Sequence, residues 1–378
     1  MFKTDPTLYN IPVAVHIIDS HNDNNTIVPA VAINENIDDP LTDFEPGLRK
    51  VIEDSSNIID TRYWVVDNSG SMLLLDGSII DYKNGENIHR KVSRFDELCD
   101  TIKTQAKIAA KLHAKTVFYP LNKPYNFNMD KIEVVDEIGL FQLNQFCDTT
   151  YPNGLTPLCA TLTKIIEDIR SKSDDLRLSN KKVIVVIATD GESSDGNIAV
   201  ILNQLKSLPC ESVIIRLCTD DNYIKDYWNS VDKELELDLD VIDDLYGEAA
   251  QIHKVNPWLT YTSNIQTCRE WGTCIKLFDL LDERTFSISE IYFFSGIILG
   301  SSANLLNPNI CQDEFISSLN IQINKLNKVY NPLTKKLCPI INDLSLPCLI
   351  TTPFMNVELK FNNIILGLII FIFVKNLF

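Results

Sequence analysis

Three predominantly apolar runs constrain the fold of this chain more than any other feature of its sequence. They are residues 63–66, 183–188 and 212–217. Strands that are covered on both faces have such continuous apolar sequences, and they are typical of parallel sheets. Segments with the apolar spacing of helices alternate with these runs, which implies right-handed crossover connections. We therefore predict an α/β fold with a doubly wound, mostly parallel sheet flanked by helices.

Oxygen-bearing side chains stand where these strands are expected to end. Asp67, Ser69 and Ser71 occupy alternate positions directly after the first run, and Asp190 follows the second. Thr156 opens a helix that is expected between them. Ligands of open α/β sheets bind at the carboxyl ends of the strands. The five residues therefore predict a shared site.

Each piece also has an ordinary structural explanation. A turn rich in Asn, Ser and Gly commonly follows a strand, and an Asp-Gly pair is a common turn. Thr156 followed by Pro157 is typical of a helix N-cap with proline at the first helical position. We favour the shared site because all three pieces occur together, each at an expected strand end or helix start.

The donor set indicates which ligand such a site would hold. Two carboxylates and three hydroxyls are hard oxygen donors, and neither Cys nor His is among them. Mg²⁺ prefers near-octahedral oxygen coordination and keeps some of its waters. We expect Mg²⁺ or Mn²⁺, with one coordination position left for a carboxylate of a partner. The candidate metal residues are Asp67, Ser69, Ser71, Thr156 and Asp190.

This pattern resembles the metal-ion-dependent adhesion site of von Willebrand factor A domains. Asp-x-Ser-x-Ser, then Thr, then Asp occur in that order within residues 61–254. The resemblance implies a Mg²⁺ site that recognises a protein partner through an exposed Glu or Asp. Asn68 occupies a position that varies freely in the motif. The chain departs from a compact A domain, because residues 73–93 separate the motif from a helix that is expected to begin at Arg94. We predict a small hairpin within residues 73–93, with Asp76-Gly77 between its apolar arms.

The composition excludes some classes of protein. The formal net charge is −17, and no basic stripe offsets it, which argues against nucleic-acid binding. Ten Cys occur without a Cys-x-x-Cys pair, and the five His have no metal-ligand spacing. The N-terminal sequence contains no secretion signal, so we expect a cytoplasmic protein with reduced thiols.

We divide the chain into four parts. Residues 1–60 form an N-terminal extension with short strands, 61–254 the A domain, 255–345 a mainly helical C-terminal region, and 346–378 an apolar tail. Helices are expected over 245–254, 276–284 and 288–299, with Ser287 and Glu290 as a capping box for the last. The stretch after residue 255 resembles an extension found in uncharacterised A-domain proteins of protists and large DNA viruses, and it implies no activity.

Residues 219–244 contain ten acidic residues and two Lys. An acidic docking surface for a basic partner is one explanation. We favour a solvated edge strand over 234–241, because apolar and acidic residues alternate there with period two.

The tail contains eleven consecutive residues without a polar side chain, 364–374. A helix from 364 to the end would span about 22 Å, less than the roughly 30 Å hydrocarbon core of a bilayer. We therefore favour an apolar segment docked on the protein, and a membrane anchor formed by 361–378 is the alternative.

Three functions follow from these observations. The first is a Mg²⁺-dependent protein-binding module, and we expect no enzymatic activity. The second is a Mg²⁺-dependent enzyme for phosphoryl transfer or hydrolysis. Against it, the chain has no phosphate-binding Gly-x-x-x-x-Gly-Lys loop, no Lys or Arg beside the motif residues in sequence, and Ser69 where an aspartyl phosphatase carries a second Asp. The third is a tail-anchored membrane adaptor.

Overall fold

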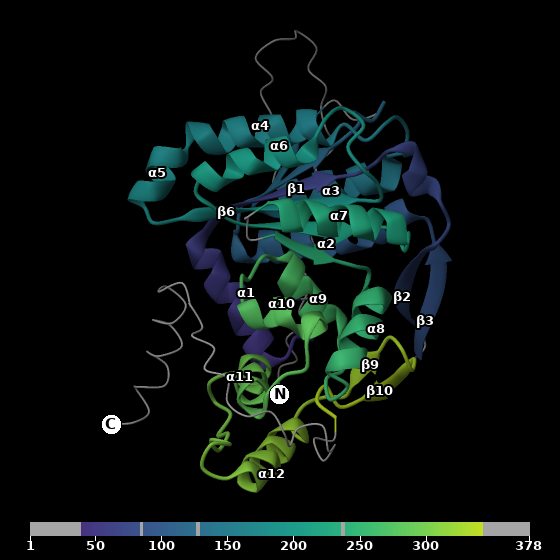
Figure 1. The fold of residues 1–378 in the computed structure, drawn as a ribbon. Coiled ribbons are helices and arrows are strands. Elements are labelled where there is room, and N and C mark those ends of the chain that lie inside the picture. The colour runs from purple at the N-terminus through teal and green to yellow at the C-terminus, as the bar shows by residue number, and fades with distance from the viewer. Residues whose placement is uncertain (1–38, 84–85, 126–128, 236–238, 343–378) are drawn as a thin grey trace, which may run out of the picture.

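A six-stranded sheet forms the centre of the computed structural model, which describes residues 39–83, 86–125, 129–235 and 239–342 (Figure 1). The strand order is β5-β4-β1-β6-β7-β8. All neighbouring pairs are parallel except β4 and β5, which confirms the predicted α/β fold. The strands are β1 (Ile59–Val66), β4 (Thr116–Pro120), β5 (Ile132–Val134), β6 (Lys182–Thr189), β7 (Cys210–Leu217) and β8 (Leu239–Ile242).

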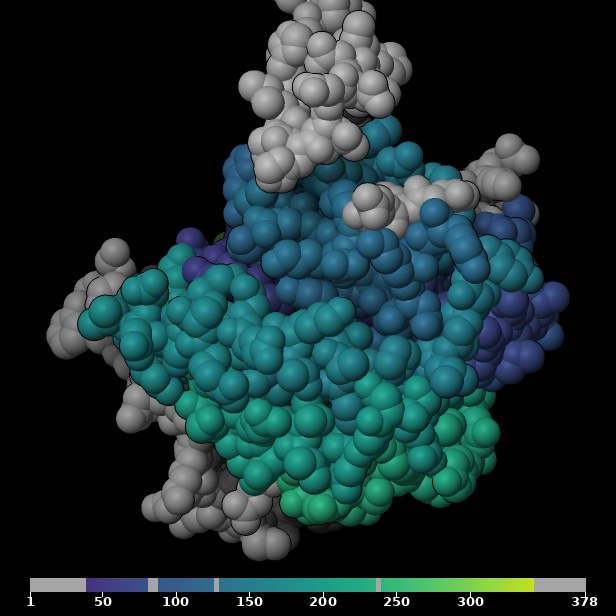
Figure 2. All heavy atoms as spheres, turned by 90° about the horizontal axis from the view of Figure 1, so that it is seen from above, coloured from purple at the N-terminus to yellow at the C-terminus, as the bar shows by residue number. Residues whose placement is uncertain are grey.

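Successive side chains of β1 point into two different hydrophobic cores, one on each face of the sheet. Tyr63 and Val65 belong to one core, and Trp64 and Val66 belong to the other. This alternation explains why the run is apolar throughout. The first core is closed by a layer of helices whose outer surface is drawn in teal and green in Figure 2. They are α4 (Leu158–Ser171), α5 (Ser173–Leu178), α6 (Ile198–Leu202) and α7 (Asn222–Glu234).

The second core is larger and includes the helices that follow residue 255. The Arg62 guanidinium lies over the Trp271 ring at 3.9 Å and joins this part of the chain to the sheet. The predicted domain division at residue 254 stays a prediction, although the two sides of it share this core. The helices that contribute side chains to this second core are α1 (Pro46–Ile58), α2 (Arg94–Leu112), α3 (Glu137–Thr149), α8 (Leu245–Val255), α9 (Ser263–Glu270), α10 (Lys276–Glu283), α11 (Ile288–Leu299) and α12 (Gln312–Ile323).

Two β-hairpins lie outside the central sheet. One pairs β2 (Gly77–Lys83) with β3 (Glu86–Val92), and the other pairs β9 (Val329–Asn331) with β10 (Lys336–Cys338). The two hairpins contact each other, because the rings of His89 on β3 and Tyr330 on β9 lie 5.6 Å apart between centroids. The pairing of β2 with β3 confirms a hairpin within residues 73–93, but not the arms predicted for it. However, Asp76 precedes it and Gly77 begins it, so these residues do not form its turn.

The edge strand predicted over residues 234–241 is confirmed only at its end, as β8, and residues 236–238 lie outside the described residues. Helix α7 extends to Glu234, and β8 begins only at Leu239. β8 does lie at the edge of the sheet, as expected. Its Asp240 is not simply solvated, because it accepts hydrogen bonds of 3.0 and 3.3 Å from the buried Arg269 guanidinium. A buried guanidinium needs a carboxylate partner, and this requirement outweighs the exposure that the alternating pattern suggested.

Several predicted helices are confirmed. Helix α2 begins at Arg94, and α11 has the predicted capping box of Ser287 and Glu290. Helix α1 was not predicted. The strands expected in residues 1–38 and the tail from residue 346 lie outside the described residues. Within the described ranges, no helix has both the length and the apolar composition needed to cross a membrane.

Candidate metal centre

Asp67 stands at the point where β1 leaves the sheet. Its backbone N–H still pairs with the carbonyl of Ala188 (3.0 Å), which places it beside the end of β6. Its side chain is buried, with 0 % exposure. The carboxylate accepts hydrogen bonds from the Ser69 N–H (2.8 Å) and from the Thr189 hydroxyl (2.6 Å). The residue is therefore held rigidly at the carboxyl edge of the sheet.

A chain of oxygen atoms connects the first part of the motif to the last. The Ser69 and Ser71 hydroxyls lie 3.1 Å apart, and the Ser71 hydroxyl donates to Asp190 Oδ1 at 2.8 Å. Asp67 enters this chain through the N–H of Ser69. The structure thus brings together four of the five predicted residues.

The fifth residue, Thr156, lies in the neighbouring loop, and within the described residues its side chain forms no hydrogen bond to the other four. The loop is joined to the motif by two backbone hydrogen bonds, from Gly70 N–H to the Gly154 carbonyl and from Asn153 N–H to the Asn68 carbonyl. Within the described residues, the Thr156 hydroxyl has no hydrogen-bond partner. Its alternative role as a helix N-cap is wrong, because α4 begins at Leu158 and Pro157 is the N-cap residue.

Asn68 positions these loops, a role that the sequence interpretation missed. Its side-chain amide donates to the Asn122 carbonyl (2.7 Å), and its oxygen accepts from the Asn122 N–H (2.8 Å). The Asn122 side chain in turn donates to the Leu155 carbonyl (2.7 Å). Asn68 is only 1 % exposed. The residue between the first two motif positions therefore fixes the Thr156 loop against the motif, although it supplies no predicted ligand.

Arg94 is a further member of the site that sequence spacing did not indicate. It is the first residue of α2, and its guanidinium donates to Asp190 Oδ2 at 2.8 Å. The other edge of the guanidinium binds both oxygens of Asp76, at 2.7 and 2.6 Å. A positive charge therefore lies next to the motif in space, although no Lys or Arg lies beside it in sequence.

The electrostatics differ between the two motif carboxylates. Asp190 is paired with Arg94, whereas no cationic side chain in the described ranges forms an ion pair with Asp67. Burial raises the pKa of Asp67, and the charge of Asp190 raises it further, while the hydrogen bonds from Thr189 and Ser69 lower it. A buried carboxylate without a counter-ion is costly. A bound cation would remove this cost.

The spacing of the donors also fits a small divalent cation. Two oxygens that are each about 2.1 Å from Mg²⁺ and at right angles lie about 3 Å apart. The Ser69–Ser71 and Ser71–Asp190 oxygen pairs are separated by 3.1 and 2.8 Å. All the donors are hard oxygens, as Mg²⁺ and Mn²⁺ require. The residues present therefore fit the cation that the donor types predicted.

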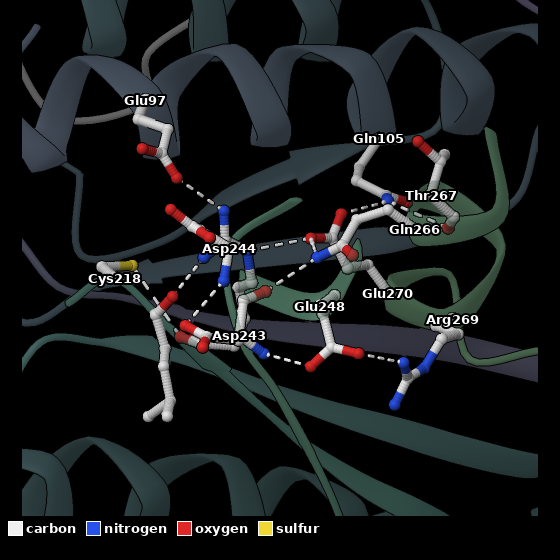
Figure 3. A network of polar contacts seen from close by, with 12 residues as sticks. Glu97, Gln105, Cys218, Asp243, Asp244, Glu248, Gln266, Thr267, Arg269 and Glu270 are labelled. Carbon is white, nitrogen blue, oxygen red and sulfur yellow. Dashed lines mark hydrogen bonds and ion pairs between the residues drawn. The ribbon is translucent and has the colours of Figure 1, made fainter. Parts of the chain in front are cut away.

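A buried ionic network holds α2, and with it Arg94, against the sheet (Figure 3). The Arg216 guanidinium of β7 donates to Glu97 (2.8 Å) and to Glu270 (3.0 Å). Burial acts to lower the pKa of Arg216, but the two carboxylates hold it well above its ordinary value. Glu97 also accepts the N–H of Ser78 (2.8 Å) at the start of β2. The network thus links the hairpin, α2, the sheet and α9.

A second acidic cluster lies nearby. The carboxylate oxygens of Asp220, Asp243 and Asp244 lie within 4.8 Å of one another. Lys225 forms ion pairs with Asp243 and with Asp220. Because a lysine already compensates this cluster, it has less need of a cation than Asp67 has.

No protein-family model matches this chain, and no curated protein matches it.

Proposed function

We propose that this chain is an A-domain-type module that holds Mg²⁺ or Mn²⁺ and binds an acidic side chain of a protein partner. The ligands would be Asp67, Ser69, Ser71 and Asp190, with Thr156 from the adjoining loop. One observation supports this proposal most strongly. Asp67 is a fully buried carboxylate with no cationic partner among the described residues, and it is joined through Ser69 and Ser71 to a second carboxylate.

The metal would supply an electrophilic centre for a carboxylate. The protein as a whole carries a formal charge of −17, so an acidic partner would ordinarily be repelled. A bound divalent cation reverses the sign of the potential locally. The residues of this chain would hold the cation at the sheet edge and leave one position for an oxygen of the partner.

The surroundings of the site also favour a protein partner. Leu74 and Leu75 follow the motif, and Leu155 precedes Thr156; their side chains are 52 %, 67 % and 72 % exposed. Apolar side chains around a polar centre are typical of protein interfaces and are seldom exposed together without a reason. The expected ligand is therefore an acidic side chain flanked by apolar residues.

Calorimetry with Mn²⁺ tests the metal site directly. We expect the wild-type chain to bind one Mn²⁺ and Asp67→Ala to lose this binding, because the buried carboxylate is removed. Asp174→Ala is the matched control, since the Asp174 side chain is 95 % exposed on α5, a helix that carries no motif residue. Ser71→Ala, which leaves both carboxylates in place, should bind Mn²⁺ more weakly. Equal binding by wild type and a folded Asp67→Ala would remove the site.

A Mg²⁺-dependent enzyme for phosphoryl transfer or hydrolysis is the second candidate. The position of Arg94 favours it, because a guanidinium beside a metal site suits a phosphoryl group. A phosphatase and ATPase screen with Mg²⁺, comparing wild type with Asp67→Ala, distinguishes it from the binding module. Turnover that requires Asp67 would favour the enzyme.

A further inference from the structure

We propose that Arg94 sets the charge of the metal site and thereby makes the loaded site a receptor for a carboxylate. The inference rests on the proposed function, because it concerns the same site. Arg94 would thus determine specificity although it is not part of the motif and lies 23 positions after Ser71 in the sequence.

Arg94 is positioned by contacts on both sides. Its backbone N–H donates to the Leu74 carbonyl (3.0 Å), which joins the first turn of α2 to the end of the motif loop. One edge of the guanidinium binds Asp190, and the other binds Asp76 through two hydrogen bonds. The Arg94 side chain is 11 % exposed and the Asp190 side chain is 0 % exposed. The pair with Asp190 is therefore shielded from solvent, where charge interactions are stronger.

The consequence for a bound cation follows from the charges. Asp190 is compensated by Arg94, so Asp67 is the only motif carboxylate whose charge is not balanced by a side chain in the described ranges. A divalent cation would then leave about one positive charge in excess, which an incoming carboxylate would neutralise. Without Arg94, the two carboxylates would balance the cation by themselves, and a third carboxylate would gain less.

Asp76 does not cancel this effect. Its side chain is 45 % exposed, so solvent screens its charge far more than that of Asp190. It contacts the edge of the guanidinium that faces away from Asp190. Asp76 therefore acts as a positioning residue that holds the fork of Arg94 in place.

The experiment measures two affinities in the full chain. The first is Mn²⁺ affinity by calorimetry, and the second is acetate binding to the Mn²⁺-loaded protein by water-proton relaxation, with sodium chloride at equal ionic strength as the salt control. For Arg94→Met we expect Mn²⁺ affinity to rise about tenfold and acetate affinity to fall about tenfold. A tenfold change corresponds to about 1.4 kcal/mol of binding free energy, the size of effect expected from removing one partly shielded charge. Acetate should displace metal-bound water and lower the relaxation enhancement.

Two variants serve as controls. Arg49→Met removes an arginine that also pairs with two carboxylates, Asp39 and Glu53, but lies on α1, and it should leave both affinities unchanged. Arg94→Lys keeps the charge without the fork and should retain most acetate binding, even where Arg94→Met is less stable. Unchanged acetate affinity in Arg94→Met, or weaker Mn²⁺ binding in a folded variant, would overturn the role of Arg94. If the proposed function itself is wrong, the result is distinguishable, because the wild-type chain would then not bind Mn²⁺.

Discussion

Gly154 fixes the geometry of the loop that carries Thr156. Its φ is +86°, a conformation that residues with a Cβ seldom adopt. A Cβ at this position would lie 2.4 Å from the Asn122 side-chain oxygen, and that side chain holds the Leu155 carbonyl. The glycine therefore allows the loop to approach Asn122 closely and to accept the Gly70 N–H.

We predict that Gly154→Ala lowers the free energy of unfolding by about 1–3 kcal/mol, because it adds both backbone strain and a clash. It should also weaken Mn²⁺ binding, since the loop would shift away from the motif. Chemical denaturation and calorimetry measure the two effects. Gly191→Ala is the control at the same site, because a Cβ there meets no atom within 4 Å. Equal effects of the two substitutions would contradict this explanation.

Single residues of the site differed in how far they could be predicted. Asp67 and Asp190 directly follow apolar strands, so their position at the sheet edge was evident from local sequence. Arg94 and Asn122 reach the site from other elements, and no local pattern connects them to the motif. Their contributions depend on tertiary packing, which the sequence does not encode at short range.

The N-terminal turn of α2 is the element on which the site depends most. Ser93 and Asp96 form a capping box there, in which the Ser93 hydroxyl accepts the Asp96 N–H at 3.0 Å. This turn also carries Arg94, which binds Asp190, and Glu97, which binds Arg216. The cap therefore stabilises the part of the helix that contacts both the candidate metal site and the buried network.

We predict that Ser93→Ala lowers the free energy of unfolding by about 1 kcal/mol, because it leaves the Asp96 N–H without its acceptor. Thr104→Ala on the same helix should change stability by less than about 0.5 kcal/mol, since its exposed hydroxyl only donates to the Asp100 carbonyl. Urea denaturation of the two variants compares them. If Thr104→Ala costs as much as Ser93→Ala, the cap has no special role.

At the level of whole elements, strong apolar periodicity decided what could be predicted. Helices α2 and α4 each bury a long apolar stripe, and both were expected. Helix α7 buries only Trp228 and Val231, and acidic residues surround it. The charge pattern of this segment therefore concealed its helical period. The strand predicted from Glu234 begins too early for the same reason, because Glu234 belongs to α7.

Across the molecule, the second core contains acidic groups as well as apolar ones. Glu248 is 1 % exposed; it accepts the Asp243 N–H (2.8 Å) and pairs with Arg269. Burial raises the pKa of Glu248 to about 7, against the lowering effect of Arg269. The protein thus positions a carboxyl group that remains protonated in the folded state at a pH where it is ionised in the unfolded chain.

This shift makes stability depend on pH with a definite sign. The folded pKa of Glu248 is about 7 and the ordinary value is 4.5, so between these values the folded state binds more protons than the unfolded state. Stability must therefore fall as the pH rises through this window. For one such group, the free energy of unfolding falls by about 2 kcal/mol between about pH 5.5 and pH 7.5.

We predict that Glu248→Gln reduces this pH dependence, because the amide does not titrate. Urea denaturation of metal-free protein at the two pH values measures it for the wild type, for Glu248→Gln and for Asp174→Asn. The last variant replaces an exposed carboxylate and should behave as the wild type does. The Gln variant is expected to be less stable at both pH values, since an amide NH2 group replaces one of the two oxygens that accept hydrogen bonds from Asp243 N–H and from Arg269. The decisive quantity is therefore the difference in stability between the two pH values. An undiminished difference in Glu248→Gln would show that other buried acids cause the effect, and Asp279, whose pKa burial also raises to about 7, is the next residue to replace.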